Sequence, residues 1–370
     1  MQNKPYIALG LMSGTSLDGI DAAFIETNGE DVLSFGPSIC LPYPDTKLLR
    51  ATIDAALAWG FEGDAPEIFS RAGDYLDRAH MRAVTRICTA HPDWGQRLEV
   101  IGYHGQTVLH HPAREGFAGQ TLQLGDGAVL AAEFGVPCVY DFRSADVEAG
   151  GQGAPLAPIY HEAMCRSSMF FGRVAVVNIG GVSNVTLVDP DVDLRATDCG
   201  AGNGPLDSWT AKHGRGSYDK DGALSLAGEA RQDLIDAWLT RDFFTRPMPR
   251  SADRYDFDVL PEMDGLNVED GAATLAAFCA QGIARDVKDF APETVIICGG
   301  GRHNPAIMNT LAAHIDSKII TSESVAWDGD GLEAQAFAFL AVRSLRGLPL
   351  SFRGTTGVAR DMTGGVVAGA

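Results

Sequence analysis

No uninterrupted apolar run in this chain approaches the length that crosses a membrane, so we expect no membrane-spanning segment. Strand-like sequence starts within a few residues of Met1, so we expect no charged-then-apolar signal segment either. The sequence also lacks a C-x-x-C pair. Its cysteines are odd in number and widely spaced, which is typical of reduced core residues in a cytoplasmic protein. They are Cys40, Cys88, Cys138, Cys165, Cys199, Cys279 and Cys298.

Positive charge is scarce. The chain has 29 Lys and Arg against 48 Asp and Glu, a net charge of −19, which argues against nucleic acid or an anionic membrane as a partner. A phosphate ligand is still possible, because backbone amides and a bound metal ion can supply positive potential locally. With 45% hydrophobic and 21% charged residues, the composition is that of a soluble globular protein. A length of 370 residues is enough for two domains.

The stretch from residue 6 to residue 26 has the pattern of a strand, a tight turn and a second strand. Apolar runs at 6–11 and 20–26 suit buried strands. The turn between them offers backbone N–H groups, hydroxyls and glycines to an anion, and Asp18 and Asp21 can reach a metal ion or its waters. An ordinary Gly-Ser hairpin explains the same pattern. The candidate phosphate-binding residues are Gly14, Thr15, Ser16, Leu17, Asp18, Gly19, Ile20 and Asp21.

The second half of the chain repeats the order of elements expected in the first half. Each half begins with strand, turn, strand, turn, strand and continues with helices, which predicts two α/β lobes of related topology. The strands expected in the first half are 6–11, 20–26, 31–41, 98–103 and 136–140, with helices at 46–59, at 66–90 and from Asp126. In the second half we expect strands at 173–179, 185–188, 194–197 and 294–298, and helices at 304–314 and 332–345.

Two further glycine turns fit a nucleotide site. Gly180 and Gly181 follow one expected strand, and Gly299, Gly300 and Gly301 follow another. Asn304 then opens a helix, and a strand, a glycine turn and a helix N-terminus together form a natural site for a phosphate. Three such turns favour binding of nucleotide phosphates over three unrelated hairpins.

Two acidic stretches are candidates for the catalytic and substrate-binding residues. Asp198 is followed by a glycine turn and is placed to act as a general base, although a plain turn or an N-cap explains it equally. In the glycine-rich stretch 141–156, Arg143 can hold a substrate anion. The alternative is that Asp141 and Asp146 cap turns and that Arg143 pairs with one of them.

Three more polar residues are candidate substrate contacts. His104 and Gln106 can hydrogen-bond a polar substrate or can be satisfied structural groups. The spacing of His104, His110 and His111 fits no standard metal-ligand pattern. Glu333 lies in the first turn of the expected helix 332–345, where it can contact substrate or interact with the helix dipole.

Several blocks of this sequence resemble the motifs of one known protein family. The run from Gly10 to Asp21 closely resembles the N-terminal signature of the anhydro-N-acetylmuramic acid kinases. The similarity continues through blocks in the family's order across nearly the whole chain. These blocks are 104–108, 141–143, 146–156, 178–181, 198–203, 299–301 with Asn304, and Glu333.

The resemblance implies the two-lobed α/β fold of sugar kinases and actin-like ATPases, in which each lobe is a mixed sheet flanked by helices and the active site lies in the interlobe cleft. It implies an N-terminal lobe of residues 1–140, with the tail of about 349–370 packed on it, and a C-terminal lobe of residues 141–348. It also implies a cytoplasmic homodimer that uses ATP and Mg²⁺. The metal ligands are not identified by the sequence.

The implied reaction converts ATP, water and 1,6-anhydro-N-acetylmuramic acid to ADP and N-acetylmuramic acid 6-phosphate, in the recycling of cell-wall peptidoglycan. Asp198 matches the family's catalytic aspartate. His104, Gln106, Arg143, Asp146 and Glu333 match positions expected to contact the sugar and its lactyl carboxylate. The alternatives are a conventional sugar kinase that acts on a free hydroxyl and a non-catalytic actin-like module that binds ATP.

Overall fold

The computed structural model describes residues 4–14, 17–112, 117–252 and 254–369. The chain forms two compact units, one of Met1–Ser168 with Gly331–Ala370 and one of Met169–Asp330. These limits differ from the expected lobes, because 141–168 and 331–348 fold with the first unit. The expected limits followed the repeat in the sequence, whereas the observed ones follow packing, in which α6 (Pro158–Ser167) lies against α12 (Leu332–Leu345).

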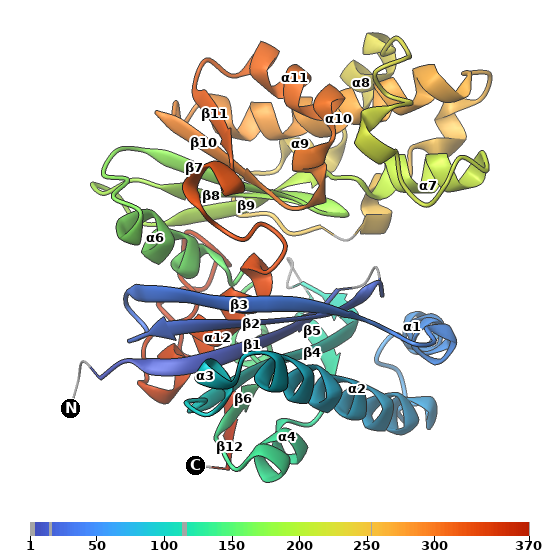
Figure 1. Ribbon diagram of the computed structural model, residues 1–370. Coiled ribbons are helices and arrows are strands. Elements are labelled where there is room, and N and C mark those ends of the chain that lie inside the picture. The colour runs from blue at the N-terminus through green and yellow to red at the C-terminus, as the bar shows by residue number, and fades with distance from the viewer. Residues whose placement is uncertain (1–3, 15–16, 113–116, 253, 370) are drawn as a thin grey trace. The chain divides into compact units, whose positions relative to one another are not determined.

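The first unit is built on a mixed seven-stranded sheet with strand order β12-β6-β4-β1-β2-β3, and β5 pairs with β4 (Figure 1). Strands β1 to β3 form antiparallel hairpins, while β4 and β6 continue the sheet parallel to β1. The tail enters the same sheet because β12 pairs with β6. The strands are β1 (Tyr6–Ser13), β2 (Gly19–Thr27), β3 (Val32–Pro42), β4 (Val100–His111), β5 (Gln120–Leu124), β6 (Cys138–Tyr140) and β12 (Val366–Ala368).

Helix α12 covers one face of this sheet at unusually short range. Gly10 of β1 and Gly102 of β4 are direct neighbours in the parallel pair and both face the helix. A Cβ atom on Gly10 would lie 1.7 Å from the carbonyl oxygen of Ala334, and one on Gly102 would lie 2.1 Å from that of Phe337. Only glycine therefore fits at these two positions.

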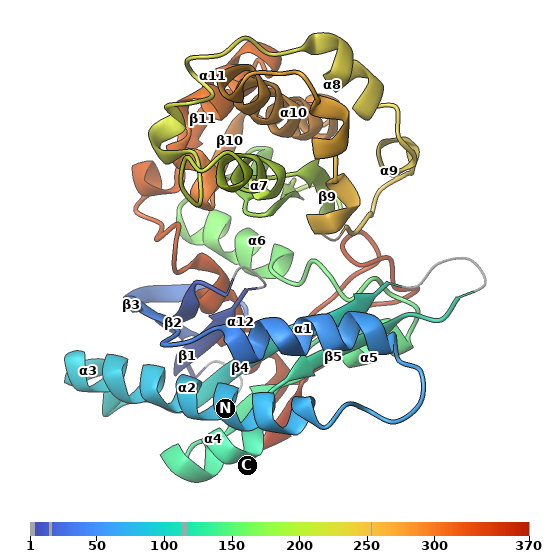
Figure 2. The ribbon, with the colours of Figure 1, turned by 90° about the vertical axis from the view of Figure 1, so that its right-hand side faces the viewer.

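The opposite face carries the main core of the first unit. Side chains that alternate along the strands, such as Leu9, Leu11 and Phe24, are fully buried against apolar residues of α2, including Leu76. Figure 2 shows α1 and α2 lying side by side. The other helices of the unit are α1 (Lys47–Trp59), α2 (Ile68–Ala90), α3 (Pro92–Gly95), α4 (Gly127–Phe134) and α5 (Ser144–Glu148).

The second unit repeats the first one's strand arrangement. Its order is β11-β10-β7-β8-β9, where β7 to β9 are antiparallel and β10 and β11 are parallel to β7. The first unit has the corresponding path β6-β4-β1-β2-β3, so the repeat expected from the sequence is confirmed. The strands are β7 (Val174–Ile179), β8 (Val182–Val188), β9 (Arg195–Ala201), β10 (Thr294–Cys298) and β11 (Lys318–Thr321).

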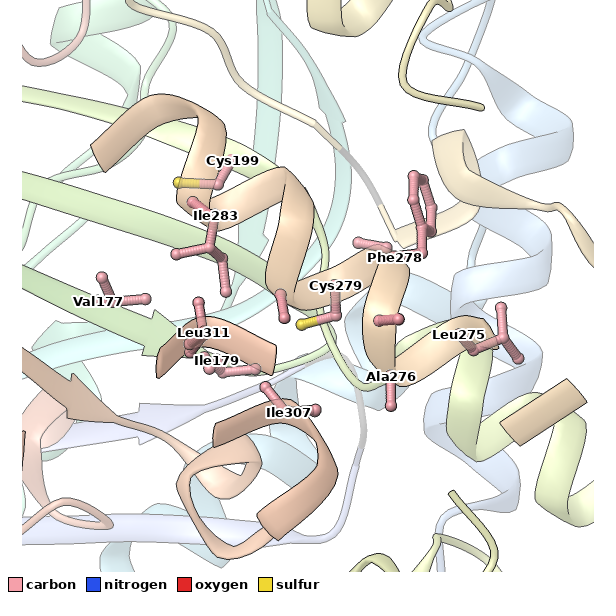
Figure 3. Packing of buried hydrophobic residues seen from close by; sticks show 14 of the residues in the cluster. Val177, Ile179, Cys199, Leu275, Ala276, Phe278, Cys279, Ile283, Ile307 and Leu311 are labelled. Carbon is pink, nitrogen blue, oxygen red and sulfur yellow. The ribbon is translucent and has the colours of Figure 1, made fainter. Parts of the chain in front are cut away.

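Helix α10 forms the centre of the second core. Figure 3 shows its side chains facing Val177 and Ile179 of β7, Cys199 of β9, and Ile307 and Leu311 of α11. The buried residues of α10 run without a break from Gly271 to Ala280, so the helix is enclosed on several sides. The helices are α7 (Gly204–Lys212), α8 (Gln232–Trp238), α9 (Asp242–Thr245), α10 (Val268–Lys288) and α11 (Pro305–His314).

Most expected elements are confirmed, and two strands are longer than expected. Strand β4 continues to His111, so His104 and Gln106 lie within a strand instead of after one. Strand β9 continues to Ala201, so Asp198 also lies within a strand, and the alternative that it caps the next helix is wrong. Asp126 caps α4 as expected, since its Oδ1 accepts a hydrogen bond of 2.8 Å from Ala128 N. None of the helices among the described residues combines the length and apolar character needed to span a bilayer.

Burial of histidines makes the first unit sensitive to acid. Burial lowers the pKa of His80, His110 and His161 to about 4 each. The folded state therefore keeps these rings neutral, while the unfolded chain takes up protons below about pH 6.5. Stability is complete above that value and decreases as the pH falls toward 4, by roughly 2 kcal/mol per histidine at pH 5.

We expect urea unfolding between pH 7 and pH 4 to show this loss, and His80→Leu to reduce its slope by about one proton. The Nδ1 atom of His80 bonds to the Leu76 carbonyl at 2.8 Å, so the comparison with wild type should be made as a change of slope and not of absolute stability. His314→Leu, at an exposed position, serves as the control. An unchanged slope in His80→Leu would contradict the buried neutral ring.

Candidate active site

The turn between β1 and β2 is partly described. Thr15 and Ser16 lie outside the described residues. The Leu17 N–H donates to the Gly14 carbonyl at 3.2 Å, with Leu17 in the left-handed region at φ 59°, and Asp18 Oδ1 accepts from Gly19 N at 3.0 Å. The chain thus turns sharply here, as the sequence predicted.

The residues of this turn have different surroundings. The side chains of Leu17 and Ile20 are buried in the core of the first unit, so only their backbone can face a ligand. Gly19 and Asp21 are ladder residues of β2. Asp18 is exposed and Gly14 is half-buried, so among the described residues of the turn these two are the ones that a ligand reaches most easily.

The donor set beside this turn fits a hard cation. Burial raises the pKa of Tyr43 well above its usual value, and the negative charges of Asp18 and Asp21 raise it further. Both carboxylates therefore act electrostatically on the Tyr43 side chain. One or two carboxylates completed by phosphate oxygens and water are the usual surroundings of Mg²⁺. Among the described residues, no group of three or more His, Cys, Asp and Glu side chains is arranged to hold a metal ion.

In the second unit, the predicted glycine turns meet at one end of the sheet. The amides of Gly202 and Gly204 each donate to the Gly181 carbonyl at 3.1 Å, and Asn203 N donates to that of Gly180 at 2.6 Å. A Cβ atom on Gly202 would lie 2.2 Å from the Gly180 oxygen, so the turn after β7 and the turn after β9 touch through their backbones.

The third glycine turn joins the same group. A Cβ atom on Gly299 would lie 2.3 Å from Asn178 Oδ1, and one on Gly301 would lie 2.2 Å from Ile179 Cγ2, so both glycines lie directly against the end of β7. At Gly300 a Cβ atom would meet Asn203 at 3.7 Å. The structure thus brings Gly180, Gly181 and Gly299–Gly301 together, which is an arrangement suited to closely approaching phosphates.

Asn304 has a structural role at the start of α11. Its Oδ1 accepts from Ala306 N at 2.9 Å and from Ile307 N at 3.4 Å, which makes it the N-cap of the helix. The same Oδ1 also accepts a hydrogen bond of 3.4 Å from Ser225 Oγ. A ligand contact by Asn304 stays a prediction, and the cap explains the residue without one.

Asp198 is 8% exposed and lies on β9, the edge strand of its sheet. Its Oδ2 accepts from Ala252 N at 2.8 Å, and its backbone N–H donates to the Arg250 carbonyl at 2.9 Å. The neighbouring Cys199 faces the core, and it is the extra residue of an irregularity in β9, where Asn184 pairs with Asp198 and Ser183 pairs with Gly200. The Ala252 amide and the strand together fix the position of this carboxylate, as acid–base chemistry requires.

Three predicted substrate residues form one network in the first unit. Arg143 donates from Nε and Nη2 to His104 Nε2 at 3.1 Å and from Nη1 to the Gly153 carbonyl at 2.7 Å. The Gly153 amide in turn donates to Asp146 Oδ1 at 2.7 Å, and Thr356 Oγ1 donates to Asp146 Oδ2 at 2.6 Å. The structure thus brings His104, Arg143 and Asp146 together.

The protonation of His104 follows from this network. Burial, together with the Arg143 charge, lowers the pKa of His104 well below its ordinary value, so the ring is neutral. Its Nδ1 then donates to the Gly105 carbonyl at 2.8 Å and its Nε2 accepts from Arg143. Of the alternatives raised by the sequence, Asp141 does cap a turn, since Ser144 Oγ donates to it at 2.6 Å, and Arg143 binds His104 and the Gly153 carbonyl.

Gln106 and Glu333 border this network. Gln106 donates to the Gly14 carbonyl at 3.3 Å, which ties it to the β1–β2 turn, and its Oε1 is buried with no hydrogen-bond partner in the described structure. Such an unsatisfied acceptor needs an explanation, and a ligand donor supplies one. Glu333 is exposed one helical turn before Phe337, whose ring lies 4.6 Å from that of His104.

Sequence reasoning missed two residues that hold predicted site residues in place. Ala252 binds the Asp198 carboxylate and Thr356 binds that of Asp146, across 54 and 210 residues of sequence respectively. Ala252 lies outside regular secondary structure and Thr356 lies in the turn that follows Phe352, and neither belongs to a periodic pattern that marks function. The run Thr355-Thr356-Gly357 was the available signal, and it is a weak one.

The repeated strand order, the clustered glycine turns and the buried aspartate define a duplicated α/β protein of the two-lobed type that the sequence predicted. The chain matches the anhydro-N-acetylmuramic acid kinase family over residues 6–369 and belongs to that family. It is 45% identical to the anhydro-N-acetylmuramic acid kinase of Mesorhizobium japonicum, covering 99% of this chain and all of that one, and 48% identical to that of Acidiphilium cryptum, covering 97% of each.

Solved structures of other proteins show a remote likeness. Component A of (R)-2-hydroxyglutaryl-CoA dehydratase from Acidaminococcus fermentans is 11% identical with a TM-score of 0.48, over 92% of this chain and 99% of that one. A ROK family glucokinase from Streptomyces griseus is 13% identical with a TM-score of 0.40, over 90% and 99%.

Proposed function

We propose that this chain is an ATP-dependent anhydro-N-acetylmuramic acid kinase, which converts 1,6-anhydro-N-acetylmuramic acid and water to N-acetylmuramic acid 6-phosphate. The observation that carries the proposal is membership of that family over residues 6–369. The relatives that share at least 45% identity over nearly the whole chain bear the same name, which disfavours a conventional sugar kinase or a non-catalytic module.

The anhydro bridge determines what the base must do. O6 is bonded to C1, so the substrate has no free 6-hydroxyl from which a base could remove a proton. In the proposed reaction Asp198 takes a proton from water, the water oxygen bonds to C1, and the C1–O6 bond breaks. The electron pair left on O6 attacks the γ-phosphorus of ATP, and ADP leaves with the pair of the broken phosphorus–oxygen bond.

The glycine turns are the proposed phosphate sites. They are the turn from Gly14 to Asp21, the pair Gly180 and Gly181, and the run Gly299–Gly301. At Gly181 a Cβ atom would meet nothing within 4 Å and at Gly300 it would meet only Asn203 at 3.7 Å, so a phosphate can come close to the backbone there. Asp18 and Asp21 are the carboxylates that would hold Mg²⁺, which supplies positive charge against the transferring phosphoryl group when bound.

The His104–Arg143–Asp146 network, with Gln106 and Glu333, is the proposed sugar site. Arg143 is the cation of this network and is the proposed ligand of the lactyl carboxylate of the sugar. The unsatisfied Gln106 Oε1 can accept from a sugar hydroxyl or amide. We also propose that the protein is a cytoplasmic homodimer that acts in the recycling of cell-wall peptidoglycan, as its family resemblance implies.

Arg143→Lys should raise the KM for the sugar about tenfold and leave the KM for ATP unchanged. A lysine ammonium cannot reproduce the planar fork that reaches both His104 and Gly153, so both the position and the bidentate capacity of the cation are lost. Steady-state kinetics in each substrate measure the two constants. Arg82→Lys, an exposed exchange on α2, is the matched control. An equal rise in both KM values would contradict the assignment.

The experiment that tests the function is ADP release by the purified protein with Mg-ATP and 1,6-anhydro-N-acetylmuramic acid in ¹⁸O-water. Label at C1 of a 6-phosphorylated product is the expected result, since water attacks C1 and the phosphoryl group goes to O6. Activity on a reducing hexose in place of the anhydro sugar would identify a conventional sugar kinase. Bound ATP without sugar-dependent ADP would overturn the proposal.

A further inference from the structure

We propose that the buried ion pair between Arg250 and Asp286 is a positioning device for Asp198. The inference rests on the proposed role of Asp198 as the base and adds two residues to the catalytic apparatus that neither the turns nor the family signature pointed to. It concerns the short segment 250–252, which lies alongside the edge strand β9.

This segment holds Asp198 at two points. The Arg250 carbonyl accepts from Asp198 N at 2.9 Å, and Ala252 N donates to Asp198 Oδ2 at 2.8 Å. A further bond of 2.9 Å runs from Arg250 N to Thr197 Oγ1. Backbone and carboxylate of the same residue are thus bound by one segment, so any shift of the segment moves the carboxylate with it.

The segment itself lacks regular secondary structure and is fixed through the Arg250 side chain. The guanidinium forms a short ion pair with Asp286 of α10, with side chains only 4% and 5% exposed. It also donates to the Asp198 carbonyl at 3.4 Å and to that of Arg246 at 3.3 Å, and it lies 5.1 Å from the centre of the Phe243 ring. The central helix of the unit is therefore linked through one side chain to the proposed base.

Stability alone is a weak reason for such a pair. Removing two charges from water costs about as much as their attraction returns, and well-packed apolar residues often serve equally well. The pair does supply direction, because the planar guanidinium presents donors to Asp286 and to the Asp198 carbonyl at fixed angles. Positioning a base to within a fraction of an ångström is what general base catalysis requires.

The test replaces the pair in three ways and measures kcat, both KM values and thermal stability on the full-length protein. The double variant Arg250→Met with Asp286→Leu removes both charges and keeps apolar volume. We expect it to fold, to leave both KM values unchanged and to lower kcat at least tenfold. Arg250→Lys keeps a cation for Asp286 but loses the planar fork that also reaches the Asp198 carbonyl, so we expect its kcat to lie between those of the double variant and wild type.

Leu275→Ala is the control for a purely structural effect, because Leu275 is buried on the same helix and contacts the same core. We expect it to lower the melting temperature and to leave kcat unchanged below that temperature. A wild-type kcat in the folded double variant would overturn the proposal. If the double variant does not fold, Asp286→Asn decides, because it keeps the shape of the side chain, and an unchanged kcat there would also overturn it.

Asp198→Asn is assayed in parallel to separate this proposal from the proposed function. If no variant and no wild-type protein phosphorylates the anhydro sugar, the proposed function fails. If wild type is active and Asp198→Asn retains its kcat while the double variant loses it, the ion pair does not act through Asp198, and the positioning role is excluded while the kinase function stands.

Discussion

Asp198→Asn is expected to lower kcat by about 10²–10⁴-fold or more while ATP binding stays close to that of wild type. Asparagine keeps the shape of the side chain but cannot accept the proton of the attacking water. Asp198 is nearly buried and held by Ala252 N, so no neighbouring carboxylate on the same strand can replace it. Sugar-dependent ADP release and titration with an ATP analogue measure the two properties.

The control for this variant is Asp191→Asn, in an exposed turn of the same unit. It removes one negative charge without touching β9, so its kcat should equal that of wild type. Near-normal turnover in Asp198→Asn would show that the base is another residue. A loss of ATP binding together with turnover would instead show that the substitution disturbs the glycine turns.

Gly10→Ala should destabilise the first unit by about 3 kcal/mol or prevent its folding, a decrease in melting temperature of roughly 10 °C. The new methyl group would lie 1.7 Å from the Ala334 carbonyl oxygen and 2.6 Å from Ala338 N, and both atoms are backbone, so no rotamer change can relieve the clash. Helix α12 would have to move away from the sheet, which opens the interface that buries Phe337 and Phe339.

Gly73→Ala provides the matched control on α2. A Cβ atom there meets nothing within 4 Å, and alanine is the better helix former, so we expect stability to rise by roughly 0.5–1 kcal/mol. The opposite signs of the two glycine substitutions can be measured by thermal unfolding of both variants. Equal stability of Gly10→Ala and wild type would mean that the close approach of α12 is not required.

Local sequence patterns predicted the helices and strands whose ends and centres are marked by neighbouring residues. The β1–β2 hairpin, the strand 294–298 and the helix 332–345 were all read correctly, because a turn or a cap marks each end and apolar spacing marks the middle. Helix α10 was missed. Continuous burial is not the reason, since α12 is buried without a break from Ala334 to Arg343 and was predicted; the available signal for α10 was its N-cap, Asn267, whose Oδ1 accepts from Asp270 N at 2.7 Å.

The site also has parts that the local sequence predicts and parts that it does not. The glycine turns were found because glycine at a strand end is visible in a single sequence, and the structure does bring those of the second unit together. The contacts of Ala252 with Asp198 and of Thr356 with Asp146 could not be found, because they join segments far apart in the chain that only the completed fold brings together. The family resemblance identified the aspartates but not what holds them.

The first unit is built from two segments that are far apart in the chain, and this has a consequence for protein synthesis. Strands β1, β2 and β4 are translated before the second unit, whereas α12, which covers their sheet, and β12, which joins it, are translated after the second unit. The second unit is one continuous segment, so it can finish folding while the nascent chain still lacks the cover for Gly10 and Gly102. Until α12 has been translated an open sheet face is available to chaperones, and a premature stop after residue 330 would leave that face permanently uncovered.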